Sequence, residues 1–338
     1  MNTRHLDTTF VNLTMTDKVF LSMSIGEGRV RDAARLTAIA RGLTMDELAT
    51  SPTAITNINI NSPRKFDVEM AAAAMAMAEM GQATVITPFT LMGAMTPVTL
   101  AGALTQQNAE ALFGIALTQL VRPGAPVVYG GFTSNVDMKT GAPAFGTPEN
   151  TLANIAGGQL ARRYGLPYRT SACSASNAVD AQAVWETQMA LWGAVNGHGN
   201  LIYHSAGWGE GGLVADFEKL IVDCEMLQAM AEFLSPPEFS EADFAFDAHD
   251  EVEPGGHFFG AAHTMERYQS AFYSPFLSDW SNHENWRDAG GRTTTERAME
   301  IWPKIVEAYT PPPSDPARIE EMQAYIAHRK EEIGSGEP

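Results

Sequence analysis

The sequence predicts an α/β fold and, more specifically, a (β/α)8 barrel. Short apolar segments alternate about seven times with long stretches of helical periodicity, and Gly-, Pro- or Ser-rich loops follow the apolar segments. The apolar segments are VFLSMSI, AITNIN, ATVITPF, APVVYGGF, LPYRTSA, NLIYHSAGW and HFFGAAHT. Strands that alternate with helices predict a parallel sheet, and seven or eight such units indicate a (β/α)8 barrel. Residues just after each strand are then the candidates for chemistry.

Local signals place the elements more closely. We expect strands at 19–25, 54–60, 83–89, 126–132, 167–173, 200–206 and within 257–264, with helices after them. Thr44 and Glu47 form a capping-box pattern, and both Thr96–Pro97 and Thr147–Pro148 resemble helix starts. Residues 1–310 are predicted to form the barrel domain, and residues 311–338 a helical tail with its helix at 316–332. Because the chain opens almost directly on a strand, the eighth strand is either cryptic or missing at the N-terminus.

Composition limits the classes of partner. The chain has 338 residues, 45% of them hydrophobic, which is enough for one large core. A net charge of −18 argues against binding to nucleic acid or to an anionic membrane. There is no signal-peptide pattern and no apolar run long enough to span a membrane. Two cysteines without a CxxC motif favour a reducing compartment, so we expect a cytoplasmic protein.

Two glycine-rich segments carry most of the candidate site residues. In GNLIYHSAGWGEGG, His204 ends a strand and Trp208 and Glu210 lie in a loop whose glycines allow close approach to a ligand. In PGGHFFGAAHT, His257 and His263 lie six residues apart, on one face of an extended segment. These three histidines could contact a polar substrate or serve the structure. They also allow a zinc site, but no HxH or HExxH spacing supports a metal.

A further group of small and aromatic residues also lies at predicted strand ends. The segment CSASN supplies Cys173, Ser174, Ser176 and Asn177, either as a nucleophile or as small residues that line a pocket. The aromatic residues at strand ends are Tyr129, Phe132, Tyr203, Trp208, Phe258 and Phe259. Because a quaternary ammonium has no N–H to donate, proteins hold it with aromatic faces and carboxylates. Glu210 beside Trp208 fits that need, although ordinary packing explains any single aromatic residue equally well.

Several of these motifs together resemble a known family. TPFTLMGAMTPVTLAGAL, QLVRPGAPVVYGGF, GAPAFGTPE, AGWGEGG and PGGHFFGAAHT look like the trimethylamine methyltransferase superfamily, in order from about residue 4 to residue 330. The resemblance implies a (β/α)8 barrel that moves a methyl group from a methylated amine to the Co(I) of a separate corrinoid protein. Family members are typically longer at the N-terminus. This sequence has only standard residues, whereas the archaeal trimethylamine enzymes carry pyrrolysine, which favours a quaternary amine such as glycine betaine as substrate.

The resemblance sets the functional expectations. It implies no tightly bound cofactor, a corrinoid supplied by a partner protein, a small methylated or quaternary amine as substrate, and no resident metal. We also expect a homo-oligomer. The substrate-binding candidates are His204, Trp208, Glu210, His257, His263, Tyr129 and Phe132. Two alternatives stay open: a barrel that binds methylamines or corrinoid without turnover, and a metal-dependent barrel hydrolase.

Overall fold

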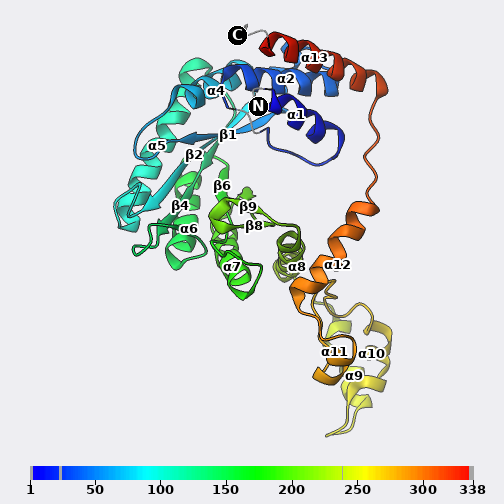
Figure 1. Cartoon of the computed structure of the whole chain (residues 1–338). Helices are drawn as coiled ribbons and strands as arrows, with labels where there is room; N and C mark the ends of the chain where they lie inside the picture. Colours follow the sequence, from blue (N-terminus) through cyan, green and yellow to red (C-terminus); the bar gives the residue numbers. More distant parts are fainter. Residues whose placement is uncertain (1–2, 23–24, 238, 335–338) are drawn as a thin grey trace.

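A parallel β-sheet forms the centre of the protein (Figure 1). The computed structural model describes residues 3–22, 25–237 and 239–334. Parallel pairing joins β1 to β2, β2 to both β3 and β4, β3 to β6, and β6 to β7. The two-residue strand β5 pairs antiparallel with β4. These strands are β1 (Ile55–Ile60), β2 (Ala83–Met92), β3 (Val127–Gly130), β4 (Phe132–Val136), β5 (Pro143–Ala144), β6 (Tyr168–Ser171) and β7 (Leu201–Tyr203).

Helices cover the outer face of the sheet. They are α4 (Val68–Glu79), α5 (Leu100–Val121), α6 (Pro148–Arg163) and α7 (Ala181–Asn196), which Figure 1 shows in sequence around the strands. The main core lies beneath them, and in it Ile58, Ile86, Tyr129 and Tyr168 are fully or almost fully buried. Side chains alternate between the two faces of a strand, so the residues next to these point to the inner face. The inner face therefore holds the side chains left for a site.

The remaining elements lie at the two ends of the chain. They are α1 (Arg4–Thr14), α2 (Glu27–Arg41), α3 (Met45–Leu48), β8 (Trp208–Gly209), η1 (Glu210–Gly212), β9 (Val214–Ala215), α8 (Phe217–Leu234), η2 (Glu241–Phe244), α9 (Phe246–Glu251), η3 (Phe258–Gly260), α10 (Ala262–Arg267), α11 (His283–Asp288), α12 (Thr294–Glu307) and α13 (Pro316–Gly334). Helix α12 packs on α8, and α13 packs on α1 and α2. None of the described helices has the length and hydropathy to span a membrane.

The α/β class and the parallel sheet are confirmed, whereas a closed barrel stays a prediction. Five of the predicted strands correspond to β1, β2, β3/β4, β6 and β7. Among the described residues no strand pairing joins β1 to β7, so the sheet has two edges. The prediction of a strand within 257–264 was wrong, because this segment forms η3 and α10.

The predicted strand at 19–25 is only partly tested. Residues 23 and 24 lie outside the described residues, and residues 19–22 are not assigned to a strand. Even so, the Ser22 amide donates to the Ile55 carbonyl at 3.0 Å, and Thr56 donates to the Ser22 carbonyl at 2.6 Å. This segment therefore runs beside β1 with only part of a strand's hydrogen bonding.

The helix-start signals have mixed outcomes. The capping box of Thr44 and Glu47 is confirmed, as is the start of α6, where Thr147 accepts from the Asn150 amide ahead of Pro148. Thr96 is not the cap of α5. Thr99 takes that position, and its side chain accepts from the Gly102 amide. The tail helix is confirmed at 316–334, but the boundary between the two predicted domains at residue 310 stays a prediction.

A buried carboxylate joins the C-terminal helix to the N-terminal helices. Asp32 of α2 accepts from Tyr325 at 2.6 Å, from Arg329 at 2.8 Å, and pairs with His5 at 2.8 Å. Burial alone would raise the pKa of Asp32, but the hydrogen bonds from His5, Tyr325 and Arg329 lower it. Asp32 therefore stays ionised, and this stabilisation is lost only as the pH falls through the lowered pKa.

We predict that Asp32→Ala lowers the free energy of unfolding by about 3 kcal/mol, because it leaves a partly buried arginine and two other polar groups without their acceptor. Chemical denaturation measures this. The matched control is Asp7→Ala, which removes the exposed 2.6 Å pair with Lys330 between the same two regions. An exposed pair contributes at most about 1 kcal/mol. Equal losses in the two variants would contradict the assigned role of Asp32.

Candidate active site

An aromatic cluster lies on β2, at the start of β4 and just after β7. The Phe132 ring lies 4.9 Å from Phe89 and 5.3 Å from Phe145, measured between ring centroids. His204 lies 5.3 Å from Phe132, and Trp208 meets His204 edge to face at 4.7 Å. The structure thus brings together Phe132, His204 and Trp208, three of the candidate residues, and adds Phe89 and Phe145. Such faces suit a cation that has lost its water.

Arg169 is the unexpected member of this group. It lies in β6, is only 2% exposed, and its guanidinium lies 4.2 Å from the Tyr203 ring and 5.2 Å from the Phe132 ring. Its Nη1 reaches the Gly131 carbonyl at 3.5 Å, its Nε has no hydrogen-bond partner, and no ion pair is found for it among the described residues. Burial lowers the pKa of Arg169 to about 10, so it is still charged at neutral pH. A buried cation without a counter-ion is costly, and an anion beside it would offset that cost.

His204 is held in one orientation and in its neutral form. Its backbone has a φ of 60°, an uncommon conformation for a residue other than glycine, and its Nδ1 is hydrogen bonded to the Ser171 hydroxyl. Burial, assisted by the charge of Arg169, lowers the pKa of His204 to about 3. At neutral pH the imidazole is therefore uncharged and adds no positive charge beside the aromatic rings.

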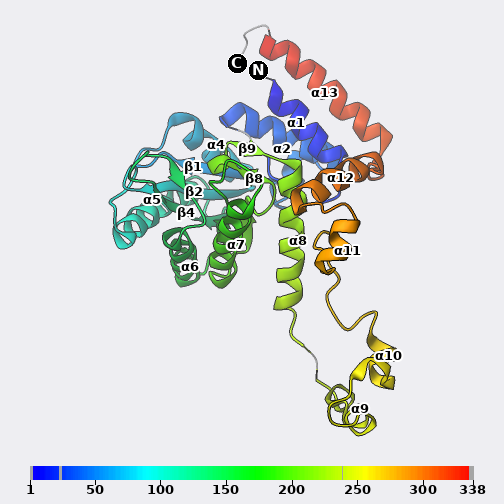
Figure 2. The same ribbon diagram turned by 60° about the horizontal axis from the view of Figure 1, so that its bottom comes forward.

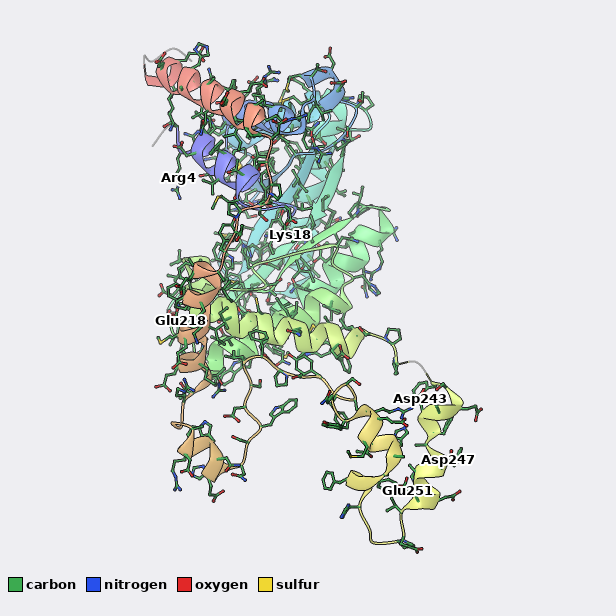
Figure 3. All side chains as sticks on the ribbon, turned by 90° about the vertical axis from the view of Figure 1, so that its right-hand side faces the viewer. Arg4, Lys18, Glu218, Asp243, Asp247 and Glu251 are labelled. Atoms are coloured by element: carbon green, nitrogen blue, oxygen red, sulfur yellow. The ribbon has the colours of Figure 1, made fainter. Side chains whose placement is uncertain are left out.

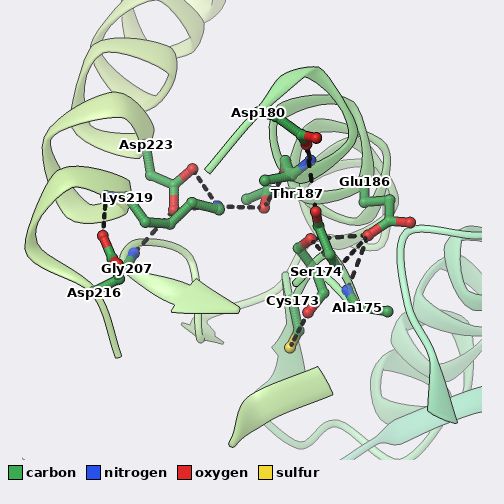
Figure 4. A network of polar contacts seen from close by, with 12 residues as sticks. Cys173, Ser174, Ala175, Asp180, Glu186, Thr187, Gly207, Asp216, Lys219 and Asp223 are labelled. Atoms are coloured by element: carbon green, nitrogen blue, oxygen red, sulfur yellow. Dashed lines mark hydrogen bonds and ion pairs between the residues drawn. The ribbon is translucent and has the colours of Figure 1, made fainter. Parts of the chain in front are cut away.

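The loop after β6 is built around Glu186 of α7 (Figure 4). One carboxylate oxygen accepts from the Ser174 hydroxyl at 2.8 Å, the Ala175 amide at 2.9 Å and the Ser176 amide at 3.1 Å. Burial raises the pKa of Cys173 to about 12, and its thiol donates to the Ser174 carbonyl. A protonated thiol packed among Leu91, Val136 and Phe145 fits the interpretation of Cys173 as a pocket-lining residue rather than a nucleophile.

The loop that carries Trp208 and Glu210 is fastened to the loop after β6. The Glu210 amide donates to the Ser176 carbonyl at 2.9 Å, and the Gly211 amide donates to the Ser174 carbonyl at 3.1 Å. Glu210 has a φ of 50° and an exposed side chain, and Asn177 is exposed as well. Both residues line a small pocket of about 90 Å³ that also includes Lys219. Glu210 thus lies two residues after Trp208 of the aromatic cluster in the sequence, but its side chain is exposed to solvent.

A buried ion pair fixes the start of the same loop. Lys219 of α8 donates to both oxygens of Asp223 at 2.6 Å and to the Thr187 hydroxyl at 2.8 Å (Figure 4). Asp223 in turn accepts from the Gly207 amide at 2.9 Å. Burial raises the pKa of Asp223, and the charge of Lys219 opposes that effect. The ion pair thereby connects α7, α8 and the glycine-rich loop.

Three predicted site residues lie elsewhere. Tyr129 is fully buried on the helix side of the sheet, where its hydroxyl donates to Asn108 at 3.1 Å. His257 and His263 lie at η3 and α10, in a segment that projects away from the sheet (Figure 2). The three histidines considered as zinc ligands are therefore not together. Among the described residues, no group of three or more His, Cys, Asp or Glu side chains could hold a metal ion.

Sequence reasoning missed Arg169, Glu186 and the Lys219–Asp223 pair. Arg169 had a visible signal, because an arginine inside the strand YRTS of a parallel sheet must be buried on one face. Lys219 and Asp223 are four residues apart on one helix, which predicts a pair but not its burial. Glu186 left no signal, since its partners are backbone amides in another part of the chain.

We predict that Lys219→Met lowers the free energy of unfolding by about 3–5 kcal/mol, because the carboxylate of Asp223 is left buried without its cation. Chemical denaturation measures the loss. The control is Lys18→Met, which removes an exposed partner of Asp17 and should change stability by less than about 1 kcal/mol. If Lys219→Met were equally mild, the pair would not be what fixes the loop.

The chain is similar in sequence to known proteins over nearly its whole length. The model of the family "Trimethylamine methyltransferase (MTTB)" matches residues 1–334. The chain is 37% identical to a glycine betaine methyltransferase of Desulfitobacterium hafniense (strain Y51), over 98% of this chain and 69% of that protein. It is 29% identical to the trimethylamine methyltransferase MttB of D. hafniense (strain DSM 10664 / DCB-2), over 94% of this chain and 63% of the relative.

A third relative is the proline betaine:corrinoid methyltransferase of Eubacterium limosum, which is 29% identical over 81% of this chain and 57% of that protein. The chain thus spans 57–69% of the length of these three relatives. With a family match over nearly its whole length, the chain belongs to the trimethylamine methyltransferase family.

Proposed function

We propose that this protein transfers a methyl group from a small quaternary amine that carries a carboxylate, such as glycine betaine, to the Co(I) of a partner corrinoid protein. The relatives named as betaine methyltransferases support this class of substrate. The observation that carries the proposal is the buried Arg169 beside the aromatic cluster, for which no counter-ion is found among the described residues. A zwitterion presents a carboxylate to the guanidinium and a trimethylammonium group to the rings.

The chain's own residues would bind and orient the substrate. The faces of Phe132 and Trp208 would hold the methylated nitrogen, and Arg169 would fix the opposite end through a charge-assisted hydrogen bond. Because the quaternary nitrogen is already cationic, it leaves as a neutral amine, so no side chain has to donate a proton. Neutral His204 is consistent with this, since it does not repel the cation.

The corrinoid supplies a strong nucleophile, Co(I), on a separate protein. What the site must add is alignment of the methyl group with the approaching metal, which is a positioning task. The inner face of the sheet and the loop that carries Trp208 lie at the carboxyl ends of the strands, where the family's barrel would open to a partner. A closed barrel, a bound substrate and a docked corrinoid protein are all parts of this proposal.

A second candidate is a protein that binds the amine without turnover. The described sheet is open between β1 and β7, so its inner face lacks the enclosure that a complete barrel provides. Demethylation with free cob(I)alamin separates the two candidates. Turnover of glycine betaine supports the enzyme, whereas saturable binding without turnover, with or without a corrinoid protein, supports the binding module.

We predict that Arg169→Met raises the KM for glycine betaine about tenfold to a hundredfold and does not raise the KM for choline. A hydrogen bond to a charged group contributes about 1.5–3 kcal/mol, and choline has no carboxylate to lose it. Steady-state demethylation gives both constants, and thermal melting checks that the variant folds. The control is Arg163→Met at the exposed end of α6. A parallel loss for both substrates would contradict the role of Arg169.

We also predict that 3,3-dimethylbutanoate, which replaces the nitrogen of glycine betaine by carbon, binds roughly thirtyfold more weakly. A desolvated cation–π contact is worth about 2 kcal/mol, and the analogue loses it because an uncharged tert-butyl group replaces the trimethylammonium group. Calorimetric competition measures the ratio. Trp208→Ala should remove much of this discrimination, and Glu210→Gln should remove little because its carboxylate faces solvent. Equal affinity for the two compounds would show that the rings do not recognise charge.

A further inference from the structure

An arm of residues 239–272 leaves the body of the protein after α8 and returns before α11 (Figures 1 and 2). It contains η2, α9, η3 and α10. Among the described residues, every hydrogen bond and ion pair given for a residue of the arm stays within the arm. Its own core is small, with Ala248 and Ala261 as its buried apolar residues. The arm is thus held to the body only through the chain at its two ends.

The arm exposes far more apolar surface than a segment in water normally does. Phe239, Phe246, Phe259 and Phe272 are 79%, 67%, 81% and 85% exposed. With roughly 150–250 Å² for an aromatic side chain, these four alone offer on the order of 600 Å². Phe244, Met265 and Tyr268 are more than half exposed as well. Together they reach the roughly 800 Å² that each partner contributes to a stable interface, so the arm is built to be covered.

The same chain has an apolar hollow that no side chain of the described residues fills. It measures about 980 Å³ and lies between α7, α8 and the returning segment 273–280. Its apolar walls are Val184, Trp185, Trp192, Met226, Met230, Phe233 and Trp280. The size suits several aromatic side chains. The arm and the hollow are therefore complementary in chemistry, aromatic surface on one and an aromatic-lined space on the other.

The arm cannot easily fill the hollow of its own chain. Glu225, inside the hollow, accepts from the Tyr273 hydroxyl at 2.9 Å and from the Phe276 and Leu277 amides at 3.0 and 2.9 Å. These bonds fix the returning segment 273–280 at the edge of the hollow, and the arm runs outward from there (Figure 3). A second copy has no such restriction, and two copies related by a two-fold axis would each fill the other's hollow.

Charge argues against two arms packing on each other. The arm has seven acidic residues and one basic residue, Arg267. Asp243, Asp247 and Glu251 are among the acidic residues and are labelled in Figure 3. Two such arms side by side would bring seven acidic residues from each copy together, whereas the lining of the hollow contains only two acidic residues, Asp180 and Glu225. We infer that the arm of residues 239–272 docks in the α7–α8 hollow of a second copy of this chain, so that the protein is an arm-exchanged homodimer or a larger assembly with this contact.

Sedimentation of the purified full chain over a range of concentrations tests the inference. Wild-type protein should sediment as a dimer or larger. The arm variant Phe259→Ser/Phe272→Ser and the hollow variant Trp185→Ser should each weaken association at least tenfold, since both act on exposed side chains. The control is Leu120→Ser, an 83% exposed residue at the end of α5, which should change nothing. Circular dichroism confirms that all variants fold.

The contact itself is located by photo-crosslinking. A benzophenone amino acid at position 259 is introduced into ¹⁵N-labelled protein, which is mixed with unlabelled protein. Crosslinks from the labelled arm to unlabelled α7 or α8 support the exchange.

Three results would each overturn the inference: a wild-type monomer at all concentrations, crosslinks within one chain only, or crosslinks between two arms. Loss of association in the arm variant but not in Trp185→Ser would overturn the choice of the hollow. A monomer whose arm crosslinks to an added corrinoid protein would reassign the arm to that partner.

Discussion

Strand β2 is the element on which the rest of the structure depends. Over its ten residues it pairs in parallel with β1 on one side and with β3 and then β4 on the other. The pairing with β4 fixes Phe89 opposite Phe132, and these two rings begin the aromatic cluster. Because parallel register brings all the carboxyl ends to one edge, the loops after β4, β6 and β7 meet there. The site is therefore a consequence of the sheet.

Buried and half-buried carboxylates then fix the loops that the sheet brings together. Glu186 collects three donors from the loop after β6, Asp223 holds Gly207, and Glu225 holds the segment that returns from the arm. An ionised carboxylate accepts several hydrogen bonds at once, and bonds from backbone amides are satisfied only in one loop conformation. Part of the acidic composition thus has a structural cause, and the candidate site is held by groups that do not touch the proposed substrate.

The sequence predicted the strands and several caps because their signals are local. Apolar runs bounded by Gly and Pro located β1, β2 and β6 closely, and the Thr147–Pro148 pattern located the start of α6. The face of the sheet to which a side chain points was harder to predict from the sequence. Tyr129 lies in a predicted strand, but a shift of one residue exchanges the two faces, and it points to the helices. His257 and His263 were placed at the site from an apolar run that forms short helices instead. The return of the chain by way of Glu225 depends on contacts far apart in sequence, which no local pattern encodes.

The net charge of −18 and the buried Arg169 together constrain the ligand. A strongly acidic protein repels anions over several ångströms to tens of ångströms, so a simple carboxylate must approach against the field before it meets the guanidinium. A zwitterion has no net charge and does not encounter this barrier, yet at contact its carboxylate faces Arg169 and its cation faces the rings. A plain cation is attracted by the field but would lie near an unneutralised arginine. Under the proposed function, the combination of a long-range negative field with one short-range positive group would favour a betaine over a simple amine or a simple acid.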